Sequence, residues 1–499
     1  MPRRLRVLSA LLLAGTAAMA LAPPARADAG TDARIQALQD QVNALNAQLQ
    51  DLKRSQSAQY DDAQRQAVEV QKAVAEAQAE TAAQAKARKS GVKVSLDNGR
   101  PTIASADGRF SASIRALVQF DSGYFMQSHH ALSLPAGQDL SSGSNFRRAQ
   151  FGIQGRLFGD WAYFFNYDFG SSKGNEQQGR IQSAYIEYDG LGPLALRIGA
   201  YPPPAGLEDG TSSADTIFLE RNSPSDVARN IAGGDGRDAA SILYAGDRLF
   251  GALSYTGGKV ADSNAYFDEQ QALLGRLSGV VLSGDEGKLV LSTSGTWVFK
   301  APDATAGPSS ARNISLSDPP ELTFDDNGVT LVSTGSLNTQ TLTQWGVEAG
   351  GNWRNLYGQA GYFGYDVSRR QSALPDLSFS GWYAQASWVI TGESRGYSAA
   401  SGAFTSPKPA GEWGAWELAA RYSDLDLNDR AGSPGLATPP GGIRGGEQRI
   451  WTLGLNWYPN AALKFMLDYE NIDVDKLSAT GADIGQKIQA VAIRSQVNL

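Results

Sequence analysis

The chain has 499 residues and a formal net charge of −7, with 55 glycines and no cysteine. The lack of cysteine excludes disulfides, and the acidic balance gives no basic bias toward nucleic acid. The composition also includes 10 Trp, 18 Tyr and 18 Phe. Together with the glycines, these residues predict many turns between aromatic strands.

Residues 1–27 have the three parts of a secretory signal peptide. MPRRLR is basic, VLSALLLAGTAAMALA is a short apolar run, and Ala25-Arg26-Ala27 is a small-x-small ending. A membrane anchor is the alternative, but the apolar run is short and contains Gly, Ser and Thr. We therefore predict cleavage before Asp28 and export. No later segment offers the roughly 18 consecutive apolar residues that a membrane helix needs.

Residues 28–90 are predicted to form a periplasmic coiled-coil segment. From Thr31 to Lys89 the chain is rich in Ala, Gln, Glu and Lys and has no Pro or Gly. Apolar residues recur at alternating spacings of three and four, namely Ile35, Leu38, Val42, Leu45, Leu49 and Leu52. This heptad pattern favours self-association. The pattern becomes polar further on, so a solvated spacer helix is the alternative. Residues 91–109 are predicted to be a linker.

After Phe110 the hydrophobic period changes to two and stays so to the end of the chain. Sixteen segments are predicted to be strands: about 110–125, 145–157, 161–169, 181–189, 194–201, 238–245, 248–257, 271–283, 288–299, 341–353, 356–365, 380–391, 414–424, 448–458, 462–473 and 488–499. Tight turns alternate with long polar loops, which include 126–144, 202–237, 300–340 and 425–447. The segment 392–413 is an exception, because it is long where a short turn is expected.

Alternating apolar and polar residues fit both a soluble β-sandwich and a membrane β-barrel, so the connections between strands must decide between them. Short turns at one rim, long loops at the other and an even strand number are typical of outer-membrane barrels. Strands can cross hydrocarbon only when a closed ring satisfies every backbone group. We therefore predict an all-β fold, a sixteen-stranded antiparallel transmembrane β-barrel over residues 110–499, with the alternate aromatic residues of 161–169 facing lipid.

A sixteen-stranded barrel encloses an aqueous channel, so the inward side chains decide what passes. The basic ones are Arg115, Arg148, Arg156, Arg197, Arg421, Lys464 and Arg494. Guanidinium groups stay charged and match anionic oxygens, and a basic pore lining selects anions. The alternative is an unselective polar lumen, in which these residues pair with acidic ones on the same face: Asp168, Glu187, Glu348, Glu417 and Asp468.

The long loop 202–237 contains Ile217, Phe218 and Leu219, which are too apolar for a loop tip in water. Folding into the barrel would bury them, constrict the channel and bring Arg221 and Arg229 toward its axis. Packing over the rim or against a neighbouring subunit is the alternative.

Several motifs resemble the phosphate-selective porin O and P family, in the family's order: FRRAQFGIQGRLFGDWAYFFNYDF, AYIEYDGLGPLALRIGAYPPPAGLE, TSSADTIFLER, GWYAQASWVITGESRGYS, WELAARYSDLDLND and LGLNWYPN. The resemblance implies a trimer, an infolded third loop and an arginine-lined path for phosphate or related anions. Arg147 and Arg148 match the family's Phe-Arg-Arg motif, and Arg221 matches its Leu-Glu-Arg motif. Lys173, in the second long loop, is a further candidate. The chain departs from the usual pattern of outer-membrane barrels in ending with Leu499 instead of an aromatic residue.

The expected function is passive diffusion of small anions, with phosphate or related oxyanions as substrates, through an outer-membrane porin. The alternative is a general or differently selective porin whose N-terminal coiled coil also tethers the outer membrane to the cell wall, with peptidoglycan as a partner. No cofactor, metal or enzymatic activity is expected. The only histidines, His129 and His130, are adjacent in one loop, Asp325-Asp326-Asn327-Gly328 is a turn sequence, and Asp268-Glu269 lies in a polar connection.

Overall fold

The computed structural model describes residues 30–97, 99–127, 139–170, 179–260, 268–324 and 329–499. The predicted signal peptide, His129, His130, Lys173 and the turn at 325–328 lie outside these residues. The chain divides into two compact units, Met1–Ala87 and Arg88–Leu499. Among the described residues, no helix combines the length and the apolarity that crossing a membrane requires.

Helix α1 (Gly30–Ser90) makes up the described part of the first unit and is 61 residues long. At 1.5 Å per residue it extends for about 90 Å. All six apolar residues of the predicted heptad pattern are more than half exposed, from 51% for Ile35 to 67% for Leu52. The apolar side of α1 is therefore uncovered in a single chain.

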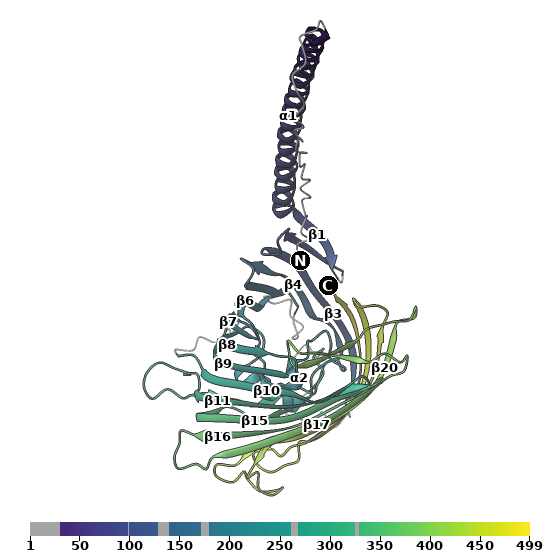
Figure 1. Ribbon diagram of the computed structural model, residues 1–499. Helices are drawn as coiled ribbons and strands as arrows, with labels where there is room; N and C mark the ends of the chain where they lie inside the picture. The colour runs from purple at the N-terminus through teal and green to yellow at the C-terminus, as the bar shows by residue number, and fades with distance from the viewer. Residues whose placement is uncertain (1–29, 98, 128–138, 171–178, 261–267, 325–328) are drawn as a thin grey trace. The chain divides into compact units, whose positions relative to one another are not determined.

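The second unit is a closed antiparallel barrel of sixteen strands, as predicted (Figure 1). The strands are β3 (Ser111–Gln127), β4 (Gly143–Leu157), β5 (Trp161–Asp168), β6 (Arg180–Leu191), β7 (Leu194–Ala200), β8 (Arg237–Ala245), β9 (Leu249–Lys259), β10 (Gln271–Gly284), β11 (Gly287–Lys300), β15 (Leu337–Trp353), β16 (Leu356–Arg369), β17 (Leu377–Val389), β20 (Ala415–Asp429), β21 (Ile443–Tyr458), β22 (Leu463–Asp475) and β23 (Gln486–Asn498). Each strand pairs with the next, and β23 pairs with β3 from Ile488–Gln127 to Asn498–Leu117. This last pairing closes the ring and leaves no barrel edge to be solvated in hydrocarbon.

Side chains alternate between the two faces of the wall as the sequence predicts. On β17 the rings of Trp382 and Trp388 are exposed on the outside, while Tyr383 and Gln385 are buried inside. On β5 Trp161 and Phe165 are 42% and 44% exposed. The aromatic row of residues 161–169 therefore lies on the outer face of the barrel.

The predicted linker at 91–109 contains a hairpin of β1 (Val92–Asp97) and β2 (Arg100–Ser105). Strand β2 pairs with the first residues of β3, from Thr102–Ser113 to Ala104–Ser111. The hairpin thus extends the sheet beyond the ring at β3.

Three connections fold into the barrel and are named here by their residues. The third loop (residues 201–236) contains α2 (Leu207–Gly210) and α3 (Ser223–Ala232), and the fifth loop (residues 301–336) contains β12 (Asn313–Ile314), β13 (Ser317–Asp318) and β14 (Val332–Ser333). The long turn (residues 390–414) contains the hairpin of β18 (Arg395–Ser398) and β19 (Ala403–Pro407). Side chains of these connections share buried apolar clusters with inward residues of the wall.

The third loop crosses the lumen to strands on the other side of the ring. The backbone N–H of Leu219 donates to Asp468 Oδ2 at 2.7 Å, and Asn456 Nδ2 donates to the carbonyl of Ile217 at 2.8 Å. Ile217, Phe218 and Leu219 are at most 4% exposed. Of the two arrangements considered for this loop, the structure therefore has the one inside the barrel.

Local sequence explains why α3 forms within the third loop. Asn222 is the N-cap and accepts a hydrogen bond from the backbone N–H of Ser225 at 3.0 Å, and Pro224 lies in the first turn. Both features are typical of helix starts. Val227, Ala228 and Ile231 of α3 are buried in the largest apolar cluster, which also contains Leu322 and Phe324 of the fifth loop. The two loops thus pack on each other inside the barrel.

Candidate functional site: the open part of the lumen

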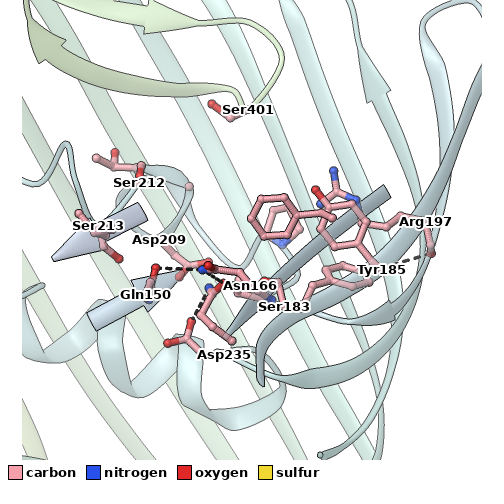
Figure 2. Close-up of a pocket in the computed structure, with 18 of the residues that line it drawn as sticks. Gln150, Asn166, Ser183, Tyr185, Arg197, Asp209, Ser212, Ser213, Asp235 and Ser401 are labelled. Carbon is pink, nitrogen blue, oxygen red and sulfur yellow. Dashed lines mark hydrogen bonds between the residues drawn. The ribbon is translucent and has the colours of Figure 1, made fainter. Parts of the chain in front are cut away.

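The infolded loops leave a cavity of ≈ 340 Å³ beside the wall formed by β3 to β9. Figure 2 shows Tyr185 and Arg197 on one side of this cavity and Ser212 and Ser213 of the third loop on the other. The long turn contributes Ser401. The charged residues of the lining are Arg115, Arg197, Arg221, Arg229, Asp209 and Asp235. Hydroxyl groups and guanidinium groups therefore line the same space.

Two of the predicted arginines reach the cavity from strands. The side chain of Arg115 on β3 has no hydrogen-bond or ion-pair partner within the described part of the chain, and its guanidinium lies 5.4 Å from the centre of the Phe164 ring. Arg197 of β7 forms an ion pair of 2.7 Å with Glu187. Of these two, only Arg197 is neutralised by a neighbouring carboxylate.

The other two arginines of the cavity lining, Arg221 and Arg229, come from the third loop, as the inward folding of this loop predicts. Arg221 Nη2 donates to the carbonyl of Thr211 at 2.8 Å, and no carboxylate pairs with it among the described residues. Arg229 lies 2.7 Å from each of Asp209 and Asp235. Burial raises the pKa of the Asp235 carboxyl, but several guanidinium groups, of which Arg229 acts most strongly, together outweigh burial and hold that pKa well below its usual range.

Arg148 and Arg156 do not line this cavity. Arg148 of β4 is only 4% exposed, and its Nη1 donates to Gln119 Oε1 at 2.7 Å. Arg156, at the end of β4, pairs with Asp189 at 2.5 Å with 44% of its side chain exposed. The structure therefore places the first in a buried polar contact and the second in an exposed ion pair.

Arg421, Lys464 and Arg494 point inward but lie beneath the infolded loops. Arg494 forms ion pairs with Asp121 at 2.6 Å and with Glu220 of the third loop at 2.8 Å. Arg421 lies 2.5 Å from Glu321 of the fifth loop and donates to the carbonyl of Glu220 at 2.8 Å. Lys464 donates to the carbonyl of Thr216. These three cations hold the loops in place and do not face the open cavity.

The acidic lumen residues also hold loops more often than they neutralise the cavity. Glu348 accepts the backbone N–H groups of Leu207 and Glu208 at 2.5 and 3.1 Å, which stabilises the start of α2. Asp168 accepts the backbone N–H of Ala149, and Glu417 pairs with Arg395 of the long turn at 3.0 Å. Only Glu187 neutralises a cation of the cavity lining among the five acidic residues predicted to share the lumen.

Two arginines outside the predicted inward set, Arg147 of the Phe-Arg-Arg motif and Arg276, also fix the inner structure. Arg147 pairs with Glu220 at 2.6 Å. Burial raises the pKa of the Glu220 carboxyl, but Arg147, Arg494 and Arg148 together outweigh burial and lower that pKa well below its usual value. Arg276 donates to the carbonyl of Ser401 at 3.1 Å and so holds the long turn. The signal for the second contact was the length of residues 392–413, which contain apolar Phe404.

No group of three or more His, Cys, Asp or Glu side chains that could hold a metal is present where the structure describes the chain. A family model described as phosphate-selective porin O and P matches residues 126–499. Porin O of Pseudomonas aeruginosa is 27% identical over 394 residues, covering 76% of this chain and 87% of that protein. An uncharacterized protein of Caulobacter vibrioides is 26% identical over 396 residues, covering 75% and 71% of the two chains.

Two solved structures are also similar. OmpT of Vibrio cholerae has a TM-score of 0.46 at 9% identity, over 78% of this chain and 99% of that one. An anion-selective porin from Comamonas acidovorans has a TM-score of 0.44 at 9% identity, over 78% and 100%.

Proposed function

The chain belongs to the phosphate-selective porin O and P family of outer-membrane porins, and from that premise we propose that its channel passes small anions by passive diffusion. Phosphate and related oxyanions are the proposed substrates. The relatives are porins, and the proposal therefore concerns permeation and not catalysis.

One observation supports anion selectivity above the others: the cavity lining carries more unpaired positive than negative charge. Four arginines and two aspartates line it. Arg229 engages both aspartates, and Glu187 engages Arg197. Arg115 and Arg221 are then left without a carboxylate among the described residues. Low-dielectric walls strengthen the potential of such charges in a narrow channel.

The chemistry of the lining also suits oxyanions. Thr211, Ser212 and Ser213 place hydroxyl groups on the same cavity as Arg221. A hydroxyl can donate one hydrogen bond, and a guanidinium can donate several in a fork that matches anionic oxygens. A phosphate crossing the cavity could therefore exchange part of its hydration shell for these donors.

The test is a measurement of ion selectivity on the full-length protein in planar bilayers. In a KCl gradient we expect a reversal potential of the sign that chloride permeation gives, and a chloride current that millimolar phosphate blocks. The double variant Arg115→Gln/Arg221→Gln should lower the chloride-to-potassium permeability ratio about 30-fold, since each of the two charges contributes on the order of 1 kcal/mol to a nearby ion. Arg156→Gln, at an exposed rim position, should leave the ratio unchanged. A cation-preferring wild-type pore would reject anion selectivity.

We also propose that the porin is a homotrimer. Strands β5 and β7 have only 8 and 7 residues, whereas a membrane-crossing strand needs about 9–11. A neighbouring copy would cover this low part of the wall.

The uncovered apolar side of α1 offers a second contact between copies, on the periplasmic side. The length of α1 also fits the alternative role of tethering the outer membrane to the cell wall.

A further inference from the structure

The open cavity contains a feature that simple oxyanion permeation does not require, which is a group of inward-facing aromatic rings. Phe164 of β5 and Tyr185 of β6 are direct cross-strand partners, and Tyr201 begins the third loop. All three line the cavity. The interior of an outer-membrane barrel is ordinarily polar, so three rings at one place of the lumen need a separate explanation.

The rings form one continuous group. Phe164 and Tyr185 are stacked, with centres 5.4 Å apart and planes inclined by 21°. Tyr201 meets Tyr185 edge-on at 5.4 Å. Gly199, opposite Tyr185 on β7, has no side chain, and a Cβ there would lie 2.9 Å from the Tyr185 Cβ. That Cβ would also lie 2.2 Å from the Ala184 carbonyl oxygen, so glycine at this position permits the close approach of β7 to β6 at Tyr185.

Two guanidinium groups lie over these rings. Arg115 is 5.4 Å from the centre of Phe164, and Arg197 is 4.4 Å from Tyr185 and 5.3 Å from Tyr201. Cation–π contact of this kind fixes the plane of a guanidinium while leaving its N–H groups available. Arg197 uses its N–H groups on Glu187. The N–H groups of Arg115 make no hydrogen bond within the described residues.

From this geometry we propose that the cavity binds small organic anions that carry one flat aromatic ring. The carboxylate would accept hydrogen bonds from Arg115, and the face of the ligand ring would contact the edges of Phe164 and Tyr185, whose own faces contact each other and the two arginines. This inference rests on the proposed anion channel and adds a substrate class to it. It differs from phosphate passage in requiring the apolar body of the ligand as well as its charge.

The test compares three monoanions as blockers of the chloride current of the full-length protein. Benzoate has the ring, cyclohexanecarboxylate has a similar size without aromaticity, and acetate has the charge alone. An aromatic pair adds a contribution that corresponds to an affinity gain of about 3- to 10-fold. We therefore expect half-block by benzoate at a concentration lower by that factor than for cyclohexanecarboxylate, and acetate to be the weakest. Equal half-block by all three would overturn the proposal.

Substitutions separate the ring contact from the charge. Phe164→Leu should remove most of the advantage of benzoate over cyclohexanecarboxylate, and Phe165→Leu, the next residue on the outer face, should keep it. Arg115→Gln should weaken block by all three anions to a similar degree. If Phe164→Leu forms no channels, Tyr185→Leu serves the same purpose. An unchanged benzoate advantage in the ring variant would refute the proposal. The reversal potential measured in the same membranes shows separately whether anion selectivity itself fails.

Discussion

At the scale of single residues, the same chemical group has different roles according to its burial. Arg494 is 1% exposed and contacts two carboxylates, whereas the Arg156 side chain is 44% exposed and contacts one. Removing one member of a buried ion pair leaves an uncompensated charge. An exposed pair is already hydrated, and its loss changes little.

This difference gives a stability prediction for the two arginines. Arg494→Gln leaves Asp121 and Glu220 without their shared guanidinium and should lower the free energy of unfolding by about 3–5 kcal/mol. Arg156→Gln is the matched control and should cost at most about 1 kcal/mol. Urea-induced unfolding from lipid vesicles, followed by tryptophan fluorescence, measures both. Equal losses in the two variants would show that the buried contacts of Arg494 do not hold the loop.

The sequence predicts which arginines point inward but not which of them stay free. Period-two alternation is a local property, so the inward side of β3 or β23 follows from a few neighbouring residues. The partners of Arg494 are 373 and 274 residues away along the chain, at Asp121 and Glu220. Neutralisation therefore depends on how the third loop folds across the lumen, which no local pattern contains.

At the scale of elements, the sixteen strands could be predicted because closure in hydrocarbon demands a repeating alternation. The infolding of the fifth loop and of the long turn was not predicted. Apolar residues in both segments were the available signal: Leu316, Leu322 and Phe324 in one, Phe404 in the other, and all four are at most 2% exposed. A polar loop that contains such residues must bury them against something, and the barrel interior is the nearest surface.

The long turn gives the second prediction. Phe404 is 1% exposed and packs edge-on against Tyr357 and Tyr397 at 4.9 and 5.3 Å. Phe404→Ala removes a buried ring, a change that typically costs about 3–5 kcal/mol. That is enough to release the β18–β19 hairpin from its inner position. We expect a larger and noisier single-channel current in the variant.

A control within the same turn is available in Trp413, which is 82% exposed. Trp413→Ala removes an aromatic ring of the long turn without changing a buried contact and should leave the current as in the wild type. If Phe404→Ala also shows wild-type amplitude and noise, the long turn does not limit the channel.

At the scale of the whole molecule, one part of the barrel interior is filled by packed loops and another part is an open cavity. The third and fifth loops and the long turn cover most of the inside of the wall, and they also reach β3 and β4, where Gln119 donates to the carbonyl of Ser213 and Asn145 donates to that of Thr323. Only part of the wall from β3 to β9 borders the cavity, and there Arg115 and Arg221 lack carboxylate partners among the described residues. For the proposed anion channel, selectivity then depends on the residues that border the cavity, and the total charge of −7 does not determine it.

The last prediction concerns helix α1, which contributes no residue to the cavity lining. Every charged residue of the cavity lining follows Phe110 in the sequence. Deleting residues 31–89 should therefore leave single-channel conductance and reversal potential unchanged. If α1 joins copies as proposed, the oligomer of the deletion variant should dissociate at a lower temperature on semi-native gels.

A second variant separates the apolar contacts from the length of the helix. Leu38→Gln, Leu45→Gln and Leu52→Gln together keep 61 helical residues but remove half of the six-residue heptad pattern. If α1 joins copies, this triple variant should lower the dissociation temperature as the deletion does. If α1 only spans the distance to the cell wall, the triple variant should keep the wild-type oligomer. A deletion variant with unchanged oligomer stability would leave the short strands β5 and β7 as the sole basis for proposing contact between copies.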